Sequence, residues 1–178
     1  MTDIPTLAEM SALLAYDPET GLFTWKPRAP EMFVCAKHQK RECLRWNNRH
    51  AGNIAGHVNS KGYVSINIFG KQRKAHRLAI LFTTGNWPKK DIDHINMNKT
   101  DNRISNLREA TRQENVANSN LRASNKSGIK GVWSHRIKGK WVAGISTKHI
   151  GVFDCPAAAS FAYQIKAHEL YGEFARVA

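Results

Sequence analysis

The sequence is poor in acidic residues and cysteine, and it has no long apolar run. Its 178 residues contain 14 Asp and Glu against 27 Lys and Arg, which gives a formal net charge of +13. No apolar stretch approaches the roughly 20 residues that a membrane-spanning helix needs. The start of the chain also lacks the basic and apolar regions of a secretory signal. We therefore expect a cytoplasmic protein with no membrane association.

The three cysteines do not form a disulfide pattern. An odd number of cysteines without a CxxC pair fits a reducing compartment. Cys35, His38, Cys43 and His50 have the residue types of a structural zinc site, but their spacing differs from that of paired zinc knuckles. Two interpretations stay open for this segment, which are a zinc site and an ordinary helix or loop.

The sequence also lacks internal repeats and low-complexity basic tails, which speaks against a nucleic-acid packaging protein. A length of 178 residues allows one domain or two small ones. The positive charge is unevenly distributed, because residues 1–34 have a net charge of −3 and the remainder has +16. Such an excess of cations indicates a polyanionic partner, most commonly nucleic acid, although a well-solvated basic surface would have the same composition.

Local patterns predict an α+β fold. Thr6 and Glu9 form a capping box, which indicates a helix over about 7–14. Apolar alternation between turn residues predicts strands over 22–25, 62–69 and 71–75. Helices are predicted over 36–49 and 76–82. The C-terminal part is preceded by a polar, basic linker and has three strand-like runs, 131–137, 140–146 and 148–153. An amphipathic helix over 156–171 follows, with Phe161, Ile165, His168 and Leu170 on or near one side.

Residues 91–118 hold the residue types of a hydrolytic site. Two short extended pieces, about 91–95 and 106–110, precede a helix that starts near residue 112 at a second capping box. This order would bring Asp93, His94 and Asn115 together. Carboxylate and amide oxygens suit Mg²⁺ or Mn²⁺, and a histidine can act as general base near neutral pH. A set of turn-forming asparagines with solvated arginines is the alternative interpretation.

The motifs of this region resemble the HNH endonucleases of phages and group I introns. They are His76-Arg77-Leu78, Asp93-His94-Ile-Asn96, Asp101-Asn102-Arg103-Ile-Ser-Asn106-Leu-Arg108 and Glu114-Asn115-x-x-Asn118. The resemblance implies a ββα-metal nuclease in which His94 is the general base. Asp93 and Asn115 would bind Mg²⁺ or Mn²⁺, and Asn106 would brace the loop and orient His94. His76 matches a family position, and we expect it to be structural.

The C-terminal part is similar to a second family. Ser127-Gly-Ile-Lys130-Gly131-Val132-Trp133, Lys140-Trp141-x-Ala143-x-Ile145, Gly151-x-Phe153 and Ala157-Ala158-Ala159-x-x-Ala162-Tyr163 resemble the Apetala-two (ethylene-response-factor, ERF) type DNA-binding domain. That resemblance implies a three-stranded antiparallel sheet backed by one helix, with the sheet facing the DNA. This sequence departs from the plant members at several positions that contact DNA. The DNA sequence that those members bind therefore cannot be assigned to this chain.

These interpretations together predict a metal-dependent HNH DNA endonuclease of the phage homing type, acting on double-stranded DNA without an obligate protein partner. The expected parts are an N-terminal α+β region at 1–75, a nuclease core at 76–120, a basic linker at 121–126 and an ERF-type domain at 127–178. If the chain is encoded by a phage, it would act in the host cytoplasm. A non-catalytic DNA-binding regulator is the alternative. The expected DNA contacts are Arg103, Arg108, Arg122, Lys126, Lys130, Trp133, His135, Arg136, Lys138, Lys140 and Lys148.

Overall fold

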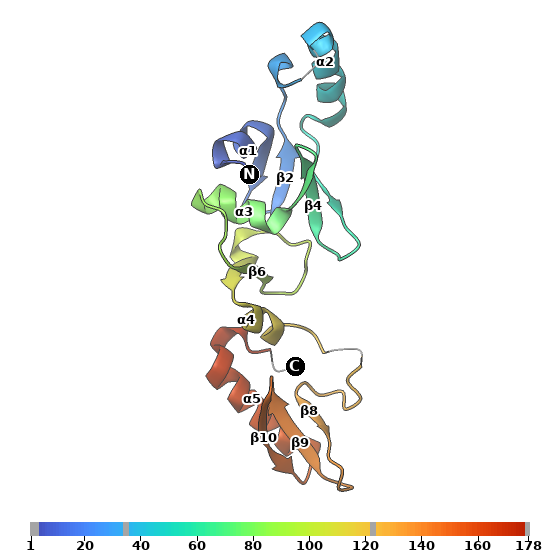
Figure 1. The fold of residues 1–178 in the computed structure, drawn as a ribbon, viewed down its shortest axis with the longest axis vertical. Coiled ribbons are helices and arrows are strands. Elements are labelled where there is room, and N and C mark those ends of the chain that lie inside the picture. The colour runs from blue at the N-terminus through green and yellow to red at the C-terminus, as the bar shows by residue number, and fades with distance from the viewer. Residues whose placement is uncertain (1–3, 34–35, 122–123, 177–178) are drawn as a thin grey trace. The chain divides into compact units, whose positions relative to one another are not determined.

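The chain forms an α+β fold of short helices and small antiparallel sheets, as predicted (Figure 1). The structure is a computed structural model that describes residues 4–33, 36–121 and 124–176. Within these ranges no helix has both the length and the apolar character needed to cross a membrane. The chain divides into two compact units, Met1–Glu109 and Ala110–Ala178.

Where the structure describes it, the first unit contains three helices and seven short strands. The helices are α1 (Leu7–Leu13), α2 (Gln39–His50) and α3 (Ala75–Thr84), with single 3₁₀ turns at Pro30–Met32, Ala36–His38 and Ile104–Asn106. The strands are β1 (Leu14–Asp17), β2 (Leu22–Trp25), β3 (His57–Val58), β4 (Val64–Ile68), β5 (Lys71–Lys74), β6 (Asp91–His94) and β7 (Leu107–Ala110). They form the antiparallel hairpin β1–β2, the antiparallel sheet β3–β4–β5 and the two-stranded sheet β6–β7, whose last residue belongs to the second unit.

Helix ends in this unit follow the local sequence closely. The Thr6 side chain accepts from the Glu9 backbone N–H, and the Glu9 carboxylate accepts from the Thr6 N–H at 2.7 Å, which is the predicted capping box. Helix α3 ends at Gly85, whose φ of 77° is in the left-handed region that favours glycine. The two strands predicted before α3, at 62–69 and 71–75, are β4 and β5. A two-residue turn joins them.

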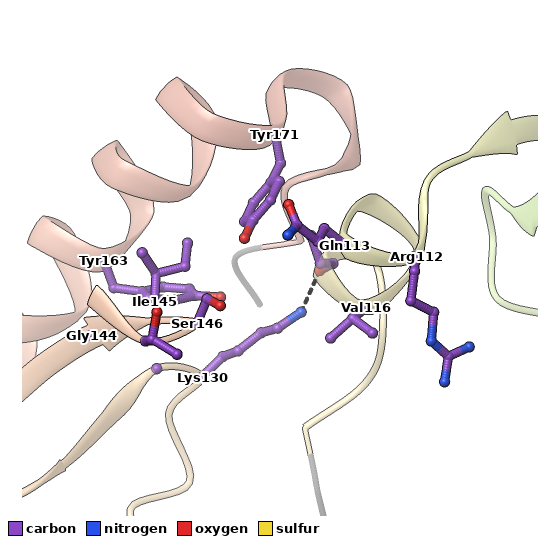
Figure 2. Close-up of a pocket in the computed structure, with 12 residues that line it drawn as sticks. Arg112, Gln113, Val116, Lys130, Gly144, Ile145, Ser146, Tyr163 and Tyr171 are labelled. Atoms are coloured by element: carbon purple, nitrogen blue, oxygen red, sulfur yellow. Dashed lines mark hydrogen bonds between the residues drawn. The ribbon is translucent and has the colours of Figure 1, made fainter. Parts of the chain in front are cut away.

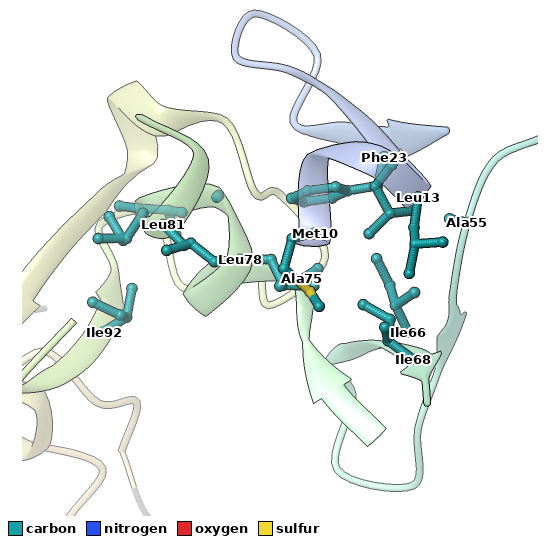
Figure 3. Close-up of a cluster of buried hydrophobic side chains, with 14 residues drawn as sticks. Met10, Leu13, Phe23, Ala55, Ile66, Ile68, Ala75, Leu78, Leu81 and Ile92 are labelled. Carbon is teal, nitrogen blue, oxygen red and sulfur yellow. The ribbon is translucent and has the colours of Figure 1, made fainter. Parts of the chain in front are cut away.

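One hydrophobic core holds these elements together (Figure 3). Met10 and Leu13 of α1, Phe23 of β2, and Ile66 of β4 are all at most 5% exposed. The Tyr16 ring stacks on Phe23 at a centroid distance of 4.7 Å. Further core residues come from β4, α3, β6 and β7, and they include Ile68, Leu78, Leu81, Ile92 and Leu107. The N-terminal hairpin and the segment that carries the candidate site therefore share one core.

The second unit contains a three-stranded antiparallel sheet and the long helix α5. Its elements are α4 (Arg112–Ala117), β8 (Val132–Ser134), β9 (Trp141–Ile145), β10 (Lys148–Phe153), α5 (Pro156–Tyr171) and a 3₁₀ turn at Gly172–Phe174. The strand order is β10–β9–β8. Helix α4 packs against α5 and the final 3₁₀ turn, so it groups with this unit, whereas the sequence placed it in the 76–120 segment.

The buried side of α5 differs from the expected one. Phe161 and Ile165 are 65% and 46% exposed, and the residues that face the sheet are instead Ala159, Tyr163 and Ala167. The physical reason is close approach. A Cβ atom added to Gly131 would lie 2.1 Å from the Tyr163 ring, so the tyrosine fills the space that this glycine leaves. Small alanines on the same stripe allow the helix to sit low on the sheet.

Candidate active site

Strand β6 places the two central residues of the predicted site side by side in the chain and out of solvent. Asp93 is 4% exposed and His94 is 5% exposed. The predicted extended pieces are β6 and β7, which form one two-stranded sheet. Buried polar groups need partners, because an unsatisfied one costs about 1–3 kcal/mol. The partners of these two residues therefore define the site.

The partner of Asp93 is Arg108 on the paired strand β7. The Arg108 guanidinium Nε donates to Asp93 Oδ2 at 3.0 Å, and only 14% of the Arg108 side chain is exposed. Sequence reasoning assigned Arg108 to DNA binding, and the structure instead places it against the candidate metal ligand. Its contact holds the carboxylate of Asp93 at a fixed position.

The imidazole of His94 lies in an aromatic pocket. Its ring centroid is 5.1 Å from that of His76 on α3, at an interplanar angle of 90°, and 6.0 Å from that of Tyr63. Burial lowers the pKa of His94, and burial lowers the pKa of His76 to about 3. Both histidines are therefore neutral at pH 7, and a neutral imidazole at His94 is the form that can accept a proton.

Asn102 lies opposite the His94 ring. Its side-chain Oδ1 is 3.4 Å from His94 Nε2, and its Nδ2 donates to the Thr100 carbonyl at 3.1 Å. Because the amide nitrogen is used by Thr100, the atom facing the imidazole is the oxygen. An acceptor at this place favours the tautomer with the proton on Nε2, which leaves Nδ1 as the basic nitrogen.

Asn102 is itself held by the N-terminal hairpin. The Tyr16 hydroxyl on β1 donates to the Asn102 carbonyl at 2.8 Å across 86 residues of sequence. Burial raises the pKa of Tyr16 to about 12, so this hydroxyl remains a donor. At the hairpin turn, a Cβ added to Gly21 would lie 2.3 Å from the Arg103 backbone nitrogen. Asn102 is one of the asparagines that the sequence predicts to be turn-forming. No local signal distinguishes it from Asn96 or Asn98.

Asn106 braces the loop between the two strands. Its Oδ1 accepts from the Asn96 N–H at 3.0 Å and its Nδ2 donates to the Asp101 carbonyl at 2.9 Å. Asn106 is 6% exposed. The amide thus joins both ends of the loop that holds Asn102, while the side chain next to the His94 ring is Asn102. Orientation of His94 by Asn106 is therefore indirect in this structure.

The donor set fits a hard divalent cation in its chemistry. Asp93 offers a carboxylate and Asn115 an amide oxygen, which suit Mg²⁺ or Mn²⁺. Asn115 is half-buried on α4 of the second unit, so its pairing with Asp93 stays a prediction. Among the described residues no three His, Cys, Asp or Glu side chains converge on one point.

The cysteine–histidine segment has other partners where the structure describes it. The Cys43 thiol donates to the Arg28 carbonyl at 3.0 Å, and the His50 ring lies 5.1 Å from that of Trp46 on α2. Cys35 is outside the described residues. These contacts support the interpretation of this segment as an ordinary helix.

Lys130 has a different role from the predicted DNA contact. Its ammonium donates to the carbonyls of Ala117 and Ser119 at the end of α4 (Figure 2). The lysine crosses a cavity of about 480 Å³ that is also lined by Ile145, Tyr163 and Tyr171. A cation at the negative end of a helix is favourable, and these bonds satisfy carbonyls that α4 leaves unpaired. Lys130 therefore fixes α4 on the second unit.

The remaining predicted DNA contacts are mostly on the surface. Arg103 makes a two-pronged ion pair with Asp101, Lys140 pairs with Asp154, and the half-buried His135 ring accepts from the Ile137 N–H. Trp133 is 49% exposed and its ring packs over Gly144, which leaves no room for a larger residue at that position. Lys126, Arg136, Lys138 and Lys148 are exposed, and Arg122 lies outside the described residues.

Comparison with known proteins supports the family that the motifs indicate. Residues 73–117 match the sequence profile of the HNH endonuclease family. An uncharacterized HNH endonuclease of Acanthamoeba polyphaga mimivirus is 32% identical over 120 residues, a span that covers 67% of this chain and 64% of that protein. A solved structure of the HNH homing endonuclease I-HmuI, described for DNA binding and cleavage, is 22% identical over 60% of this chain and 51% of its own, with a TM-score of 0.39. The match to the family profile confirms the HNH endonuclease resemblance for residues 73–117.

Proposed function

We propose that this protein is a metal-dependent HNH endonuclease that hydrolyses phosphodiester bonds of double-stranded DNA. The observation that carries the proposal is a buried, neutral His94 next to the buried carboxylate of Asp93, within the segment that matches the HNH family. A general base and a hard anionic ligand are the two groups that metal-assisted phosphodiester hydrolysis requires of a protein. The mimivirus relative, itself an HNH endonuclease by name, supports the same class.

In this mechanism the residues of the chain orient and deprotonate water. Asn102 fixes the His94 ring, so that Nδ1 can take a proton from a water molecule aimed at the phosphorus. Arg108 holds the carboxylate of Asp93 in place. Asp93 and Asn115 would hold Mg²⁺ or Mn²⁺, which supplies charge neutralisation of the phosphate and stabilises the leaving oxygen. One such site per chain would cut one strand per encounter, so a monomer would nick.

The second unit would add affinity and site choice. Its sheet carries Trp133 and the exposed Lys148, and the loop between β8 and β9 carries the exposed cations Arg136 and Lys138. These side chains suit contact with phosphates and base edges. The ERF-type resemblance and the phage homing role belong to this part of the proposal. The ERF-type resemblance is supported by the sequence motifs and by the strand order β10–β9–β8, which agrees with a three-stranded sheet backed by a helix. The phage homing role is supported by the sequence motifs of residues 76–118.

The proposal is tested by replacing the base. His94→Ala should lower the rate of Mg²⁺-dependent nicking of supercoiled plasmid by about 10²–10⁴-fold, the contribution of a positioned general base. DNA affinity measured in EDTA should remain within about twofold, because His94 is buried and does not form the DNA-binding surface. His168→Ala, at an exposed position on α5, is the matched control and should cut like wild type.

The same assay separates the nuclease from a non-catalytic regulator. A regulator would bind DNA and leave the plasmid supercoiled at every metal concentration. Equal cutting by wild type and His94→Ala would reject His94 as the base. Equal cutting in Mg²⁺ and in EDTA would reject the metal dependence.

A further inference from the structure

The turn between β4 and β5 holds an aromatic residue in an unusual backbone conformation. Ile68 pairs with Lys71, so Phe69 and Gly70 form a two-residue hairpin loop. Both have positive φ, 52° for Phe69 and 74° for Gly70. This is the geometry of a type I′ turn, in which the first position is normally Asn, Asp or Gly. A phenylalanine at this position is held at a cost in free energy.

The strain at Phe69 is not offset by burial of its ring. Its side chain is 67% exposed, more than Phe161 at 65% and far more than core aromatics such as Phe23 at 2%. The tip of the hairpin between β9 and β10 has a comparable φ of 55° at a small polar residue, Ser146. A large apolar side chain that is exposed at a strained position is accessible to a partner outside the chain.

The stretch of sequence that contains Phe69 is strongly basic. Between Glu42 and Asp91 the sequence has no Asp or Glu, and it has nine cations, Arg45, Arg49, Lys61, Lys71, Arg73, Lys74, Arg77, Lys89 and Lys90. Glu9 lines the cavity beside Phe69, but its carboxylate is bound by the Thr6 N–H and hydroxyl. An exposed aromatic ring among cations fits a nucleic acid, whose phosphates pair with the cations and whose bases stack on the ring.

The hairpin is continuous with the walls of the candidate site. Strand β5 runs directly into α3, which carries His76 against His94. The Lys74 ammonium lies 4.8 Å from the centroid of the Tyr63 ring, which itself lies beside His94. At about 3.3 Å per residue the turn is about 20 Å from Tyr63 along β4, which is about six base pairs of duplex. One bound duplex can therefore contact both places.

We propose that Phe69 is a wedge that inserts between base pairs of duplex DNA, with the cations of the β4–β5 hairpin holding the flanking phosphates. The inference rests on the proposed function in one respect, which is that the DNA contacting the hairpin is also the substrate. An inserted side chain separates neighbouring bases and unwinds or kinks the helix. The wedge would widen the duplex near the cleavage site and open the phosphate to His94.

Unwinding of plasmid DNA tests the wedge without any cleavage. The full-length protein is bound to relaxed plasmid in EDTA, a metal-independent topoisomerase relaxes the complex, and the linking number is read after protein removal. Wild type should shift the topoisomer distribution in proportion to the protein bound. Phe69→Ala should lose most of that shift and about tenfold in affinity, the loss of one base–aromatic stack. Phe161→Ala is the matched control, and it should unwind like wild type.

Two further variants separate the ring from the turn. Phe69→Trp keeps a stacking ring and should retain the shift. Phe69→Asn gives the Asn-Gly pair that a type I′ turn prefers, so it should raise the melting temperature while removing the shift. A lower melting temperature for Phe69→Asn would show that the ring supports the fold and would overturn the proposal. Wild-type unwinding by Phe69→Ala, or no unwinding by the wild-type protein, would overturn it as well.

The assay also separates the two proposals. Unwinding that depends on Phe69, together with no nicking in Mg²⁺, would keep the wedge and reject the nuclease. Nicking that depends on His94, together with unwinding that does not depend on Phe69, would keep the nuclease and reject the wedge.

Discussion

At the scale of single residues, the candidate site depends on the polar side chains that contact His94 and Asp93. His94 and Asp93 can be identified from the sequence because the motif names them. Their partners Asn102 and Arg108 cannot, because each lies in a stretch rich in Asn or Arg where many side chains have no tertiary role. What distinguishes the two partners is burial, which becomes visible only in the fold.

Asn102 offers a test of how His94 is oriented. Asn102→Ala removes the oxygen opposite Nε2, so the ring gains freedom and the kcat of DNA nicking should fall by about 10–100-fold, with a smaller change in KM. Asn98→Ala is the control within the same loop, because Asn98 is exposed and its side-chain oxygen accepts from Thr100. A matched loss of kcat in both variants would mean that the loop, and not the contact with His94, matters.

The Asp93–Arg108 pair should matter far more for stability than the neighbouring Arg103–Asp101 pair. Arg108→Gln leaves a buried carboxylate without its cation and should lower the free energy of unfolding by about 3 kcal/mol at pH 7. Arg103→Gln breaks a pair whose arginine is 48% exposed, and it should cost at most about 1 kcal/mol. Urea denaturation of both variants gives the comparison, and equal costs would contradict the buried role of Arg108.

At the scale of elements, the helix caps were predictable and the contacts between elements were not. Both capping boxes and the stop at Gly85 follow from three or four adjacent residues. Strand β1 and the buried stripe of α5 were missed. The stripe of α5 depends on Tyr163 filling the space at Gly131, 32 positions away. Non-local packing of this kind leaves no trace in a hydrophobic pattern.

The contact of the β1–β2 hairpin with the loop that holds Asn102 gives a prediction at the scale of elements. Gly21 and Gly52 both have positive φ, 72° and 80°, so alanine is strained at either position. Gly52 faces open space, and Gly52→Ala should cost about 1 kcal/mol of unfolding free energy. At Gly21 the new Cβ would meet the backbone of Asn102 and Arg103, which should add about 1–3 kcal/mol and slow DNA nicking. Calorimetry together with the nicking assay tests the pair, and equal effects of the two substitutions would contradict a bracing role for the hairpin.

At the scale of the whole molecule, the positive charge is shared by both units. Residues 1–109 have 17 Lys and Arg against 10 Asp and Glu, which gives +7, and residues 110–178 have 10 against 4, which gives +6. Residues 1–34, with a net charge of −3, belong to the first unit, which is nevertheless positive as a whole. The composition alone indicates a polyanionic partner. The division of the chain into two units adds that each unit has an excess of cations with which it could bind one. Affinity for DNA should therefore be the sum of contributions from two surfaces.

The salt dependence of binding measures the share of the second unit. Each phosphate contact contributes about −0.9 to the slope of log Kobs against log salt concentration on duplex DNA. Arg136 and Lys138 are exposed in the loop between β8 and β9, so Arg136→Gln combined with Lys138→Gln should reduce the magnitude of the slope by about 2. Lys166→Gln is the control, because Lys166 pairs with Glu169 on α5. A titration in EDTA across several salt concentrations gives the slopes. An unchanged slope in the double variant would place this loop outside the DNA-binding surface and would leave the first unit, with its basic hairpin, as the main source of affinity.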